Sequence, residues 1–226
     1  MQLIIFGPPG AGKGTLAKRM VEHCGVVHIS SGDIFRKAIS DKTDLGQKVR
    51  HYLDDGKLVP DTLTIEMVER RLREPDCKKG FLLDGFPRNL GQAQALAKFG
   101  DAEGKPIDAA VEIKVDARTV IERLTSRRTC SACGAVYNVI SMPSRVEGVC
   151  DSCGGSLVQR SDDTEDTVAT RLDVYRKKTE PLIEFYRERS LLHSVPGDES
   201  PDLVWAGVKK VLGEVAAPSH AAKKVS

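Results

Sequence analysis

A glycine-rich segment near the start of the chain constrains the fold more than any other feature. The apolar run QLIIF (2–6) leads directly into GPPGAGKGT (7–15), which contains four glycines and Lys13. Glycines let backbone N–H groups wrap around a phosphate chain, and a helix that follows directs its positive end at the same anion. Lys13 can then reach the outer phosphates. The spacing therefore predicts a phosphate-binding loop between a buried strand and a helix.

Short apolar runs alternate with longer amphipathic stretches along most of the chain. The runs with the length of strands are 2–6, 26–29, 81–84, 109–115 and 191–195. The stretches with a helical pattern are 14–23, 61–73 and 117–128, followed by a charged segment at 163–189. Pro181 should end or kink that last segment, because proline cannot continue a helix. Nearly continuous apolar runs between helices predict an α/β fold with a doubly wound parallel sheet.

Two regions interrupt this alternation. Residues 31–59 have the pattern of short helices without a strand, and residues 129–160 have the pattern of short strands and turns. Both are expected to be insertions at the ends of sheet strands, which is where open α/β folds bind their ligands.

The charge balance and the chain ends exclude several classes of protein. The chain has 34 Lys and Arg against 32 Asp and Glu, so a net charge of +2 gives no general attraction to nucleic acid or membranes. The N-terminus lacks the features of a signal peptide, and no apolar run approaches the roughly 20 residues of a membrane helix. We expect a cytoplasmic protein with reduced thiols, and a polar tail after Gly213 that frays.

Four cysteines form two CxxC pairs separated by sixteen residues. They are Cys130, Cys133, Cys150 and Cys153. This spacing fits tetrahedral Zn²⁺, and four thiolates leave no open position for water, so the metal is expected to be structural. A redox or disulfide pair is disfavoured because the strand–helix context of a redox CxxC is missing. A nucleic-acid-binding zinc ribbon is disfavoured because clustered lysines and a recognition helix are missing.

The phosphate-binding loop departs from the general pattern at one position. The hydroxyl residue that usually follows the lysine is Gly14, and the hydroxyl arrives one residue later in Thr15. We therefore expect Mg²⁺ to be held through water and acidic side chains. Asp84, which ends the buried run FLLD, has the position of the acidic residue that supports Mg²⁺ in such enzymes. Asp33 is a second candidate, although it could instead cap a helix.

Further motifs occur in an order that resembles the adenylate kinase family in its long, zinc-bearing bacterial form. They are ISSGDIFR (29–36), DDGKLVP (54–60) and LLDGFPRNLGQAQAL (82–96), in addition to the glycine loop and the CxxC pairs. The resemblance extends to about residue 213. It implies a P-loop NTPase-like five-stranded parallel sheet and a monomeric enzyme that converts Mg·ATP and AMP reversibly into two ADP.

The resemblance also implies a division into domains. The core would comprise 1–29, 60–121 and 161–216, the helical AMP-binding insertion 30–59, and the zinc-bearing β lid 122–160, with 217–226 as a disordered tail. Hinges near residues 121 and 161 would let a zinc-stiffened lid close and exclude water, which would otherwise accept the phosphoryl group.

The residue roles that the resemblance implies concern two nucleotides and the transfer between them. The ATP-binding residues are Gly10, Ala11, Gly12, Lys13, Gly14, Thr15, Arg123, Arg127 and Tyr137. The AMP-binding residues are Ser31, Arg36, Lys57, Leu58, Val59, Gly85, Phe86, Arg88, Gln92, Arg160 and Arg171, of which Gln92 reads the adenine. The catalytic residues are Lys13, Asp84, Arg88, Arg123, Arg160 and Arg171, with no obligatory general base.

Arginine suits these roles because its planar fork stays charged and binds phosphate oxygens in pairs. For Arg160 and Arg171 the competing interpretation is a set of helix-surface salt bridges with the nearby acidic residues Asp162, Asp163, Glu165 and Asp166.

Two other functions remain open at this stage. Asn89 follows FPR where adenylate kinases commonly have threonine, and Ser31 also replaces a threonine. FPRN occurs in UMP/CMP kinases, so another nucleoside monophosphate kinase is the first alternative. A zinc-ribbon nucleic-acid-binding ATPase is the alternative from a different class, but it leaves the DGFPR and ISSGD segments without a role.

Overall fold

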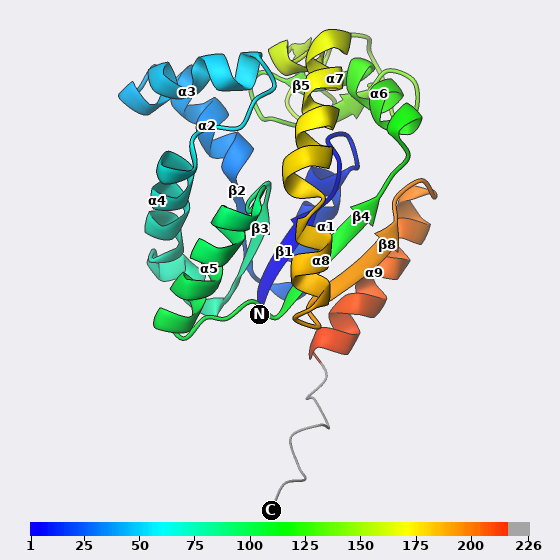
Figure 1. Cartoon of the computed structure of the whole chain (residues 1–226). Helices are drawn as coiled ribbons and strands as arrows, with labels where there is room; N and C mark the ends of the chain where they lie inside the picture. Colours follow the sequence, from blue (N-terminus) through cyan, green and yellow to red (C-terminus); the bar gives the residue numbers. More distant parts are fainter. Residues whose placement is uncertain (217–226) are drawn as a thin grey trace, which may run out of the picture.

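A computed structural model describes residues 1–216; the expected disordered tail at 217–226 lies outside them. Within this range a parallel sheet of five strands has the order β2-β3-β1-β4-β8 (Figure 1). The strands are β1 (Gln2–Phe6), β2 (Val27–Ser30), β3 (Phe81–Asp84), β4 (Ala109–Lys114) and β8 (Leu192–Pro196). The predicted fold class is confirmed, and each strand lies within one residue of its expected range at both ends.

Alternate residues of β1 explain why the sheet is covered on both faces. Leu3 and Ile5 point into one apolar cluster, and Ile4 and Phe6 point into the other. The first cluster is completed by α1 (Lys13–Cys24) and α9 (Pro201–Ala216). The second is completed by α4 (Asp61–Leu72), α5 (Leu90–Ala102) and α8 (Leu182–Arg187). Since neither face of β1 meets water, both sets of positions must be apolar, which produces the continuous run seen in the sequence.

Residues 31–54 form two helices that pack closely together. They are α2 (Ser31–Ser40), capped by Ser30, and α3 (Asp44–Asp54), capped by Thr43. A Cβ atom at Gly46 would lie 2.1 Å from the carbonyl oxygen of Ala38, so only glycine lets the helices approach this closely. Figure 1 shows this pair above the sheet, next to the ends of the strands where the loops emerge.

A small antiparallel sheet of order β6-β5-β7 forms the second insertion. Its strands are β5 (Arg127–Cys130), β6 (Val136–Asn138) and β7 (Leu157–Val158). The buried residues of its cluster are Cys130, Tyr137 and Cys150, and only two more apolar side chains pack against them. So small an apolar core gives little stability by itself, and a metal or another cross-link is needed to hold such a unit together.

The structure corrects several helix boundaries. The helix expected over 117–128 is α6 (Ala117–Thr125), because Ser126 ends it and the chain continues as β5. The segment 163–189 is divided into α7 (Glu165–Val174), a π-helical turn (Tyr175–Thr179) and α8, so a break before Pro181 is confirmed. The sequence patterns did not predict α5 and α9. Since α9 continues to Ala216, the expectation of fraying directly after Gly213 is wrong. None of the helices in residues 1–216 is both long and apolar enough to span a membrane.

Candidate functional site

Two cavities lie at the carboxyl ends of the strands. The larger has a volume of about 860 Å³ and is bordered by the glycine loop, α7, and the strands β5 and β6. It contains all nine predicted ATP-binding residues as well as Asp33 and Asp84. The smaller has a volume of about 70 Å³ and is bordered by nine of the eleven predicted AMP-binding residues. Of the other two, Arg160 borders the larger cavity, whereas Phe86 is 2% exposed in the core and borders neither. The contact of Phe86 with AMP therefore stays a prediction.

The glycine loop is shaped to receive an anion. Gly10 and Gly12 have φ angles of 77° and 82°, which side chains other than glycine rarely adopt. A Cβ atom at Gly10 would also come within 2.9 Å of the Leu124 side chain. The cap of α1 at Gly12 supplies no side-chain acceptor, so the first amides of the helix remain available to a ligand.

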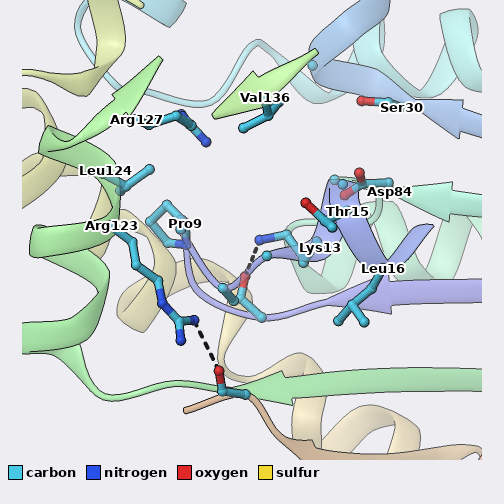
Figure 2. A pocket seen from close by; sticks show the side chains of 18 of the residues that line it. Pro9, Lys13, Thr15, Leu16, Ser30, Asp84, Arg123, Leu124, Arg127 and Val136 are labelled. Atoms are coloured by element: carbon cyan, nitrogen blue, oxygen red, sulfur yellow. Dashed lines mark hydrogen bonds between the residues drawn. The ribbon is translucent and has the colours of Figure 1, made fainter. Parts of the chain in front are cut away.

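Lys13 is held by the loop that it follows. Its Nζ donates to the carbonyl oxygens of Gly7 at 2.9 Å and Pro8 at 2.7 Å (Figure 2). Burial lowers the pKa of Lys13 to about 7; Asp84 opposes this shift, and the positive charges of Arg88 and Arg171 add to it. The lysine charge is thus poorly stabilised until a negative ligand arrives.

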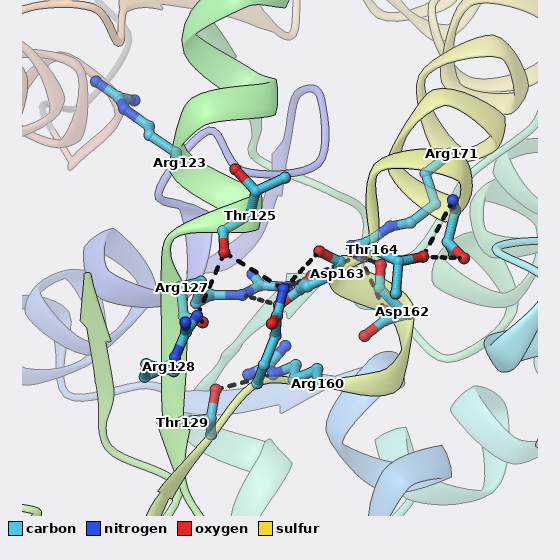
Figure 3. Close-up of polar contacts among 12 residues, drawn as sticks. Arg123, Thr125, Arg127, Arg128, Thr129, Arg160, Asp162, Asp163, Thr164 and Arg171 are labelled. Carbon is cyan, nitrogen blue, oxygen red and sulfur yellow. Dashed lines mark hydrogen bonds and ion pairs between the residues drawn. The ribbon is translucent and has the colours of Figure 1, made fainter. Parts of the chain in front are cut away.

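Three arginines, Arg127, Arg160 and Arg171, come together around two aspartates and a threonine (Figure 3). Arg127 binds the Asp163 carboxylate through two hydrogen bonds of 2.8 and 2.6 Å. Arg171 reaches Asp163 at 3.1 Å and Asp162 at 3.0 Å. Arg160 donates to the Thr129 hydroxyl at 3.1 Å. A fourth arginine, Arg88, makes none of these contacts but borders both cavities with Arg171. Because Asp163 is 0% exposed, these contacts are not surface salt bridges.

The arginine cluster carries more positive charge than its aspartates neutralise. Burial lowers the pKa of Arg88 and of Arg160 to about 10, and neighbouring guanidinium groups contribute to both shifts. Burial alone raises the pKa of Asp162, but the arginines around it outweigh that effect and hold the pKa below its usual value. Anionic ligands are therefore favoured at this position.

Arg123 does not join this cluster. Its Nη1 donates to the Gly197 carbonyl oxygen at 3.0 Å, and Figures 2 and 3 show the side chain pointing away from Arg127. The sequence prediction grouped Arg123 with the catalytic arginines. In this structure Arg123 lies apart from them, beside Gly197 on the wall of the larger cavity, and its catalytic role stays a prediction.

The two predicted magnesium residues have different surroundings. Asp84 is 9% exposed, and its Oδ2 lies 3.4 Å from Nε2 of His28, a buried nitrogen without a hydrogen-bond partner. Asp33 pairs with Arg36 at 2.6 Å, and it does not cap α2, because the side chain of Ser30 accepts the Asp33 amide. Carboxylate oxygens beside the phosphate-binding loop fit the hard-oxygen preference of Mg²⁺.

The four cysteines meet at one point in the small sheet. All four sulfur atoms lie within 4.8 Å of one another. The Sγ atoms of Cys130 and Cys153 are 3.5 Å apart, and those of Cys133 and Cys150 are 3.6 Å apart. A disulfide needs about 2.05 Å, whereas tetrahedral zinc with bonds of about 2.3 Å sets its sulfurs roughly 3.8 Å apart. The cluster could thus hold a metal such as zinc, and both cysteine pairs are reduced thiols.

Tyr137 serves the cysteine cluster as well as the cavity. Its hydroxyl lies 3.5 Å from Cys150 Sγ and accepts the Asp151 amide at 2.8 Å. Several hydrogen bonds lower the pKa of Cys150 to about 6, and the one from the Tyr137 hydroxyl has the largest effect. A lower pKa favours the thiolate form that a metal requires.

Sequence reasoning missed three polar residues that support the site. Asp163 was considered only as a surface partner, and neither His28 nor Asp61 was singled out. Asp61 accepts hydrogen bonds from Asn89 and Gln92. The only signal in the sequence for Asp163 was its place three residues after Arg160 and shortly before a helix.

Comparison with known proteins gives consistent matches over nearly the whole chain. A family model described as adenylate kinase matches residues 5–191. An adenylate kinase of Fervidobacterium nodosum is 54% identical over 213 residues, which is 94% of this chain and 98% of the relative. One of Clostridium acetobutylicum is 52% identical over 95% of this chain and 100% of the relative. An adenylate kinase of Bacillus subtilis is 49% identical over 94% of this chain and 98% of the relative.

Proposed function

The chain belongs to the adenylate kinase family of nucleoside monophosphate kinases, and we propose that it transfers the γ-phosphoryl group of Mg·ATP reversibly to AMP, giving two ADP. The observation that carries this proposal is that the two cavities share their cationic lining. Arg36, Arg88 and Arg171 border both. Phosphates of two nucleotides placed in the two cavities would therefore meet among the same guanidinium groups.

Positioning and charge neutralisation account for most of the chemistry of phosphoryl transfer. Lys13 exchanges its hydrogen bonds to the loop carbonyls for the phosphates of ATP. Arg88, Arg160 and Arg171 stabilise the charge on the transferring group, while Asp162 and Asp163 hold Arg171 and Arg127 in position. No covalent intermediate forms on the enzyme.

Magnesium would be held through water by Asp84, with Asp33 as a second carboxylate. Bound there, it supplies positive charge that neutralises the phosphate oxygens during transfer. Arg123 also borders the larger cavity, where it donates to Gly197. With Leu124, Pro201 and Val204 it offers a flat cation and apolar surface for the adenine and ribose of ATP.

The small sheet acts in this proposal as a lid stiffened by zinc. The lid comprises residues 122–160 and turns about hinges near 121 and 161, and residues 30–59 form the AMP-binding insertion. Arg127 is the first residue of β5 and already pairs with Asp163, so this contact joins the lid to the turn before α7, beside the site proposed for the phosphates. We also propose that the enzyme is a cytoplasmic monomer that binds ATP, AMP and ADP but not nucleic acid, consistent with its reduced thiols and balanced charge.

The alternative of a UMP/CMP kinase rested on Asn89. In the structure Asn89 caps α5 by accepting the Gln92 amide and donates to Asp61, and it borders neither cavity. Its identity therefore gives no reason to expect a pyrimidine in the smaller cavity.

Phosphorylation of AMP, CMP, UMP and GMP by Mg·ATP tests the proposal directly. We expect kcat/KM for AMP to exceed that for the other monophosphates by about 100-fold or more, because buried polar groups discriminate strongly. A preference for CMP or UMP would overturn the assignment to AMP. Nucleic-acid-stimulated ATP hydrolysis without AMP phosphorylation would instead support the zinc-ribbon ATPase.

A further inference from the structure

The side-chain amide of Gln92 is held at both of its polar atoms. Gln92 lies on α5 and is 2% exposed. Its Nε2 donates to Oδ1 of Asp61 at 2.7 Å, and its Oε1 accepts the backbone N–H of Arg88 at 2.8 Å. Asn89 donates to the same Asp61 oxygen at 2.8 Å. Asp61 is the first residue of α4, which lies beside α5 (Figure 1).

The chemistry of the two partners allows only one orientation of this amide. A carboxylate only accepts hydrogen bonds, and a peptide N–H only donates them. If the amide were reversed, Nε2 would face the Arg88 N–H and Oε1 would face the Asp61 carboxylate, so two buried pairs would be lost. Of the two partners, the Arg88 amide belongs to the backbone, whereas Asp61 is the one that a substitution can remove.

The held amide still has hydrogen-bonding capacity for a ligand. One N–H of Nε2 and one lone pair of Oε1 remain unused. Gln92 borders the smaller cavity, whereas Asp61 borders neither. A base in that cavity therefore meets Nε2 of Gln92 as a donor and Oε1 as an acceptor, and the amide cannot rotate to exchange the two positions.

We propose that Asp61 is a positioning residue that makes the monophosphate site selective for 6-aminopurines over 6-oxopurines. The inference rests on the proposed function, in which the base of AMP lies against Gln92. The ring nitrogen N1 of adenine accepts and its 6-amino group donates, which matches the fixed amide. Hypoxanthine and guanine present N1–H and a carbonyl oxygen at these places, so they match only the reversed amide.

A purely structural role for Asp61 is the competing explanation, because a carboxylate in the first turn also stabilises a helix. Asp44 provides a matched control. It is the first residue of α3, it is exposed, and its side chain is not among the groups that contact Gln92 or line either cavity. A general loss of helix stability affects both variants, whereas a loss of base selectivity affects only the Asp61 variant.

The test measures kcat and KM for AMP and for IMP with the full chain and Mg·ATP. For Asp61→Ala we expect the AMP-to-IMP ratio of kcat/KM to fall by about tenfold or more, mainly through a higher KM for AMP, with the KM for ATP unchanged. Asp61→Asn keeps an acceptor oxygen and should stay within about threefold of the wild-type ratio. Asp44→Ala should leave the ratio unchanged.

A second set of variants tests whether Asp61 acts through Gln92. Adding Asp61→Ala to Gln92→Leu should not change the ratio further, because the amide is already absent. The proposal is overturned if folded Asp61→Ala keeps the wild-type AMP-to-IMP ratio of kcat/KM. It is also overturned if Asp61→Ala lowers this ratio as much in the Gln92→Leu protein as it does in the wild type. If Asp61→Ala does not fold, Asp61→Ser replaces it, since serine favours a helix start but is too short to reach Nε2. A wild-type preference for CMP or UMP would instead refute the proposed function, so the two failures are distinguishable.

Discussion

Both carboxylate oxygens of Asp163 accept hydrogen bonds from the Arg127 guanidinium, at 2.8 and 2.6 Å, although the two residues are 36 positions apart in the sequence. The contact joins the first strand of the small sheet to the turn that precedes α7. Arg171 reaches the same carboxylate from α7. One buried side chain therefore fixes two arginines that line the larger cavity.

Asp163→Ala should lower the free energy of unfolding by about 3–5 kcal/mol, because it leaves Arg127 without its carboxylate partner and Arg171 with Asp162 alone. We also expect kcat to fall at least about tenfold, since Arg127 and Arg171 lose their positions. Urea denaturation and steady-state kinetics measure these effects. Asp166→Ala is the control, as Asp166 is exposed in the first turn of the same helix. If Asp163→Ala and Asp166→Ala had equally small effects on the free energy of unfolding and on kcat, the buried Arg127–Asp163 pair would be unimportant.

Binding of ATP should be accompanied by proton uptake at Lys13. In the nucleotide-free protein burial lowers the pKa of Lys13 to about 7, so the amine is mostly neutral at pH 8. The phosphates raise this pKa again, and about 0.9 of a proton should be taken up at pH 8. Affinity for ATP should therefore fall as the pH rises from about 7 towards 10.

Calorimetry in buffers of different ionisation enthalpy measures the number of protons taken up. Lys13→Met should abolish the uptake, and Lys48→Met, on exposed α3, should keep it. Binding heats that do not depend on the buffer at pH 8 would be inconsistent with a neutral Lys13.

Cys130→Ser should lower the zinc content of the protein and the melting temperature of the lid more than its turnover at moderate temperature. The small sheet has few apolar contacts, so most of its stability depends on the four sulfur ligands. Metal analysis and hydrogen exchange in β5–β7 follow the loss, and chelation of the metal should reproduce it. Cys24→Ser, outside the cluster, is the control. Complete loss of activity with an intact fold would contradict a structural role.

Arg123→Ala should raise the KM for ATP by about tenfold and change kcat much less, because its guanidinium borders the larger cavity beside Gly197 and makes no contact with the arginine cluster. Arg160→Ala, by contrast, should lower kcat by roughly 10³-fold, as expected for an arginine at the transferring group. Arg118→Ala on the same helix α6 should have neither effect, since Arg118 lies away from both cavities. A kcat loss for Arg123→Ala as large as that for Arg160→Ala would restore Arg123 to the catalytic group.

The sequence predicted the strands of the core sheet to within one residue because each contains a short apolar run, which is almost fully buried in the central strands β1, β3 and β4. The glycine loop was equally clear, since its backbone conformation requires glycine at fixed positions. Helix α5 was missed because its segment, LGQAQALAKFGDA, contains two glycines and is apolar on much of its surface. The end of α6 was placed too late, because Arg127 and Arg128 suit a helix as well as a strand, and only pairing with β6 selects the strand.

Local spacing by itself determined that this chain has a glycine loop between a strand and a helix, a doubly wound sheet and four cysteines spaced so that they could hold a metal, because glycine conformation, strand burial and thiolate spacing are properties of short segments. The tertiary structure decided which charged and polar side chains work together. Asp163 meets Arg127, Asp61 meets Gln92, and Arg123 turns away from the other arginines. A hydrogen bond depends on positions in space that distant elements bring together, and a lone arginine or aspartate in a sequence does not reveal its partner.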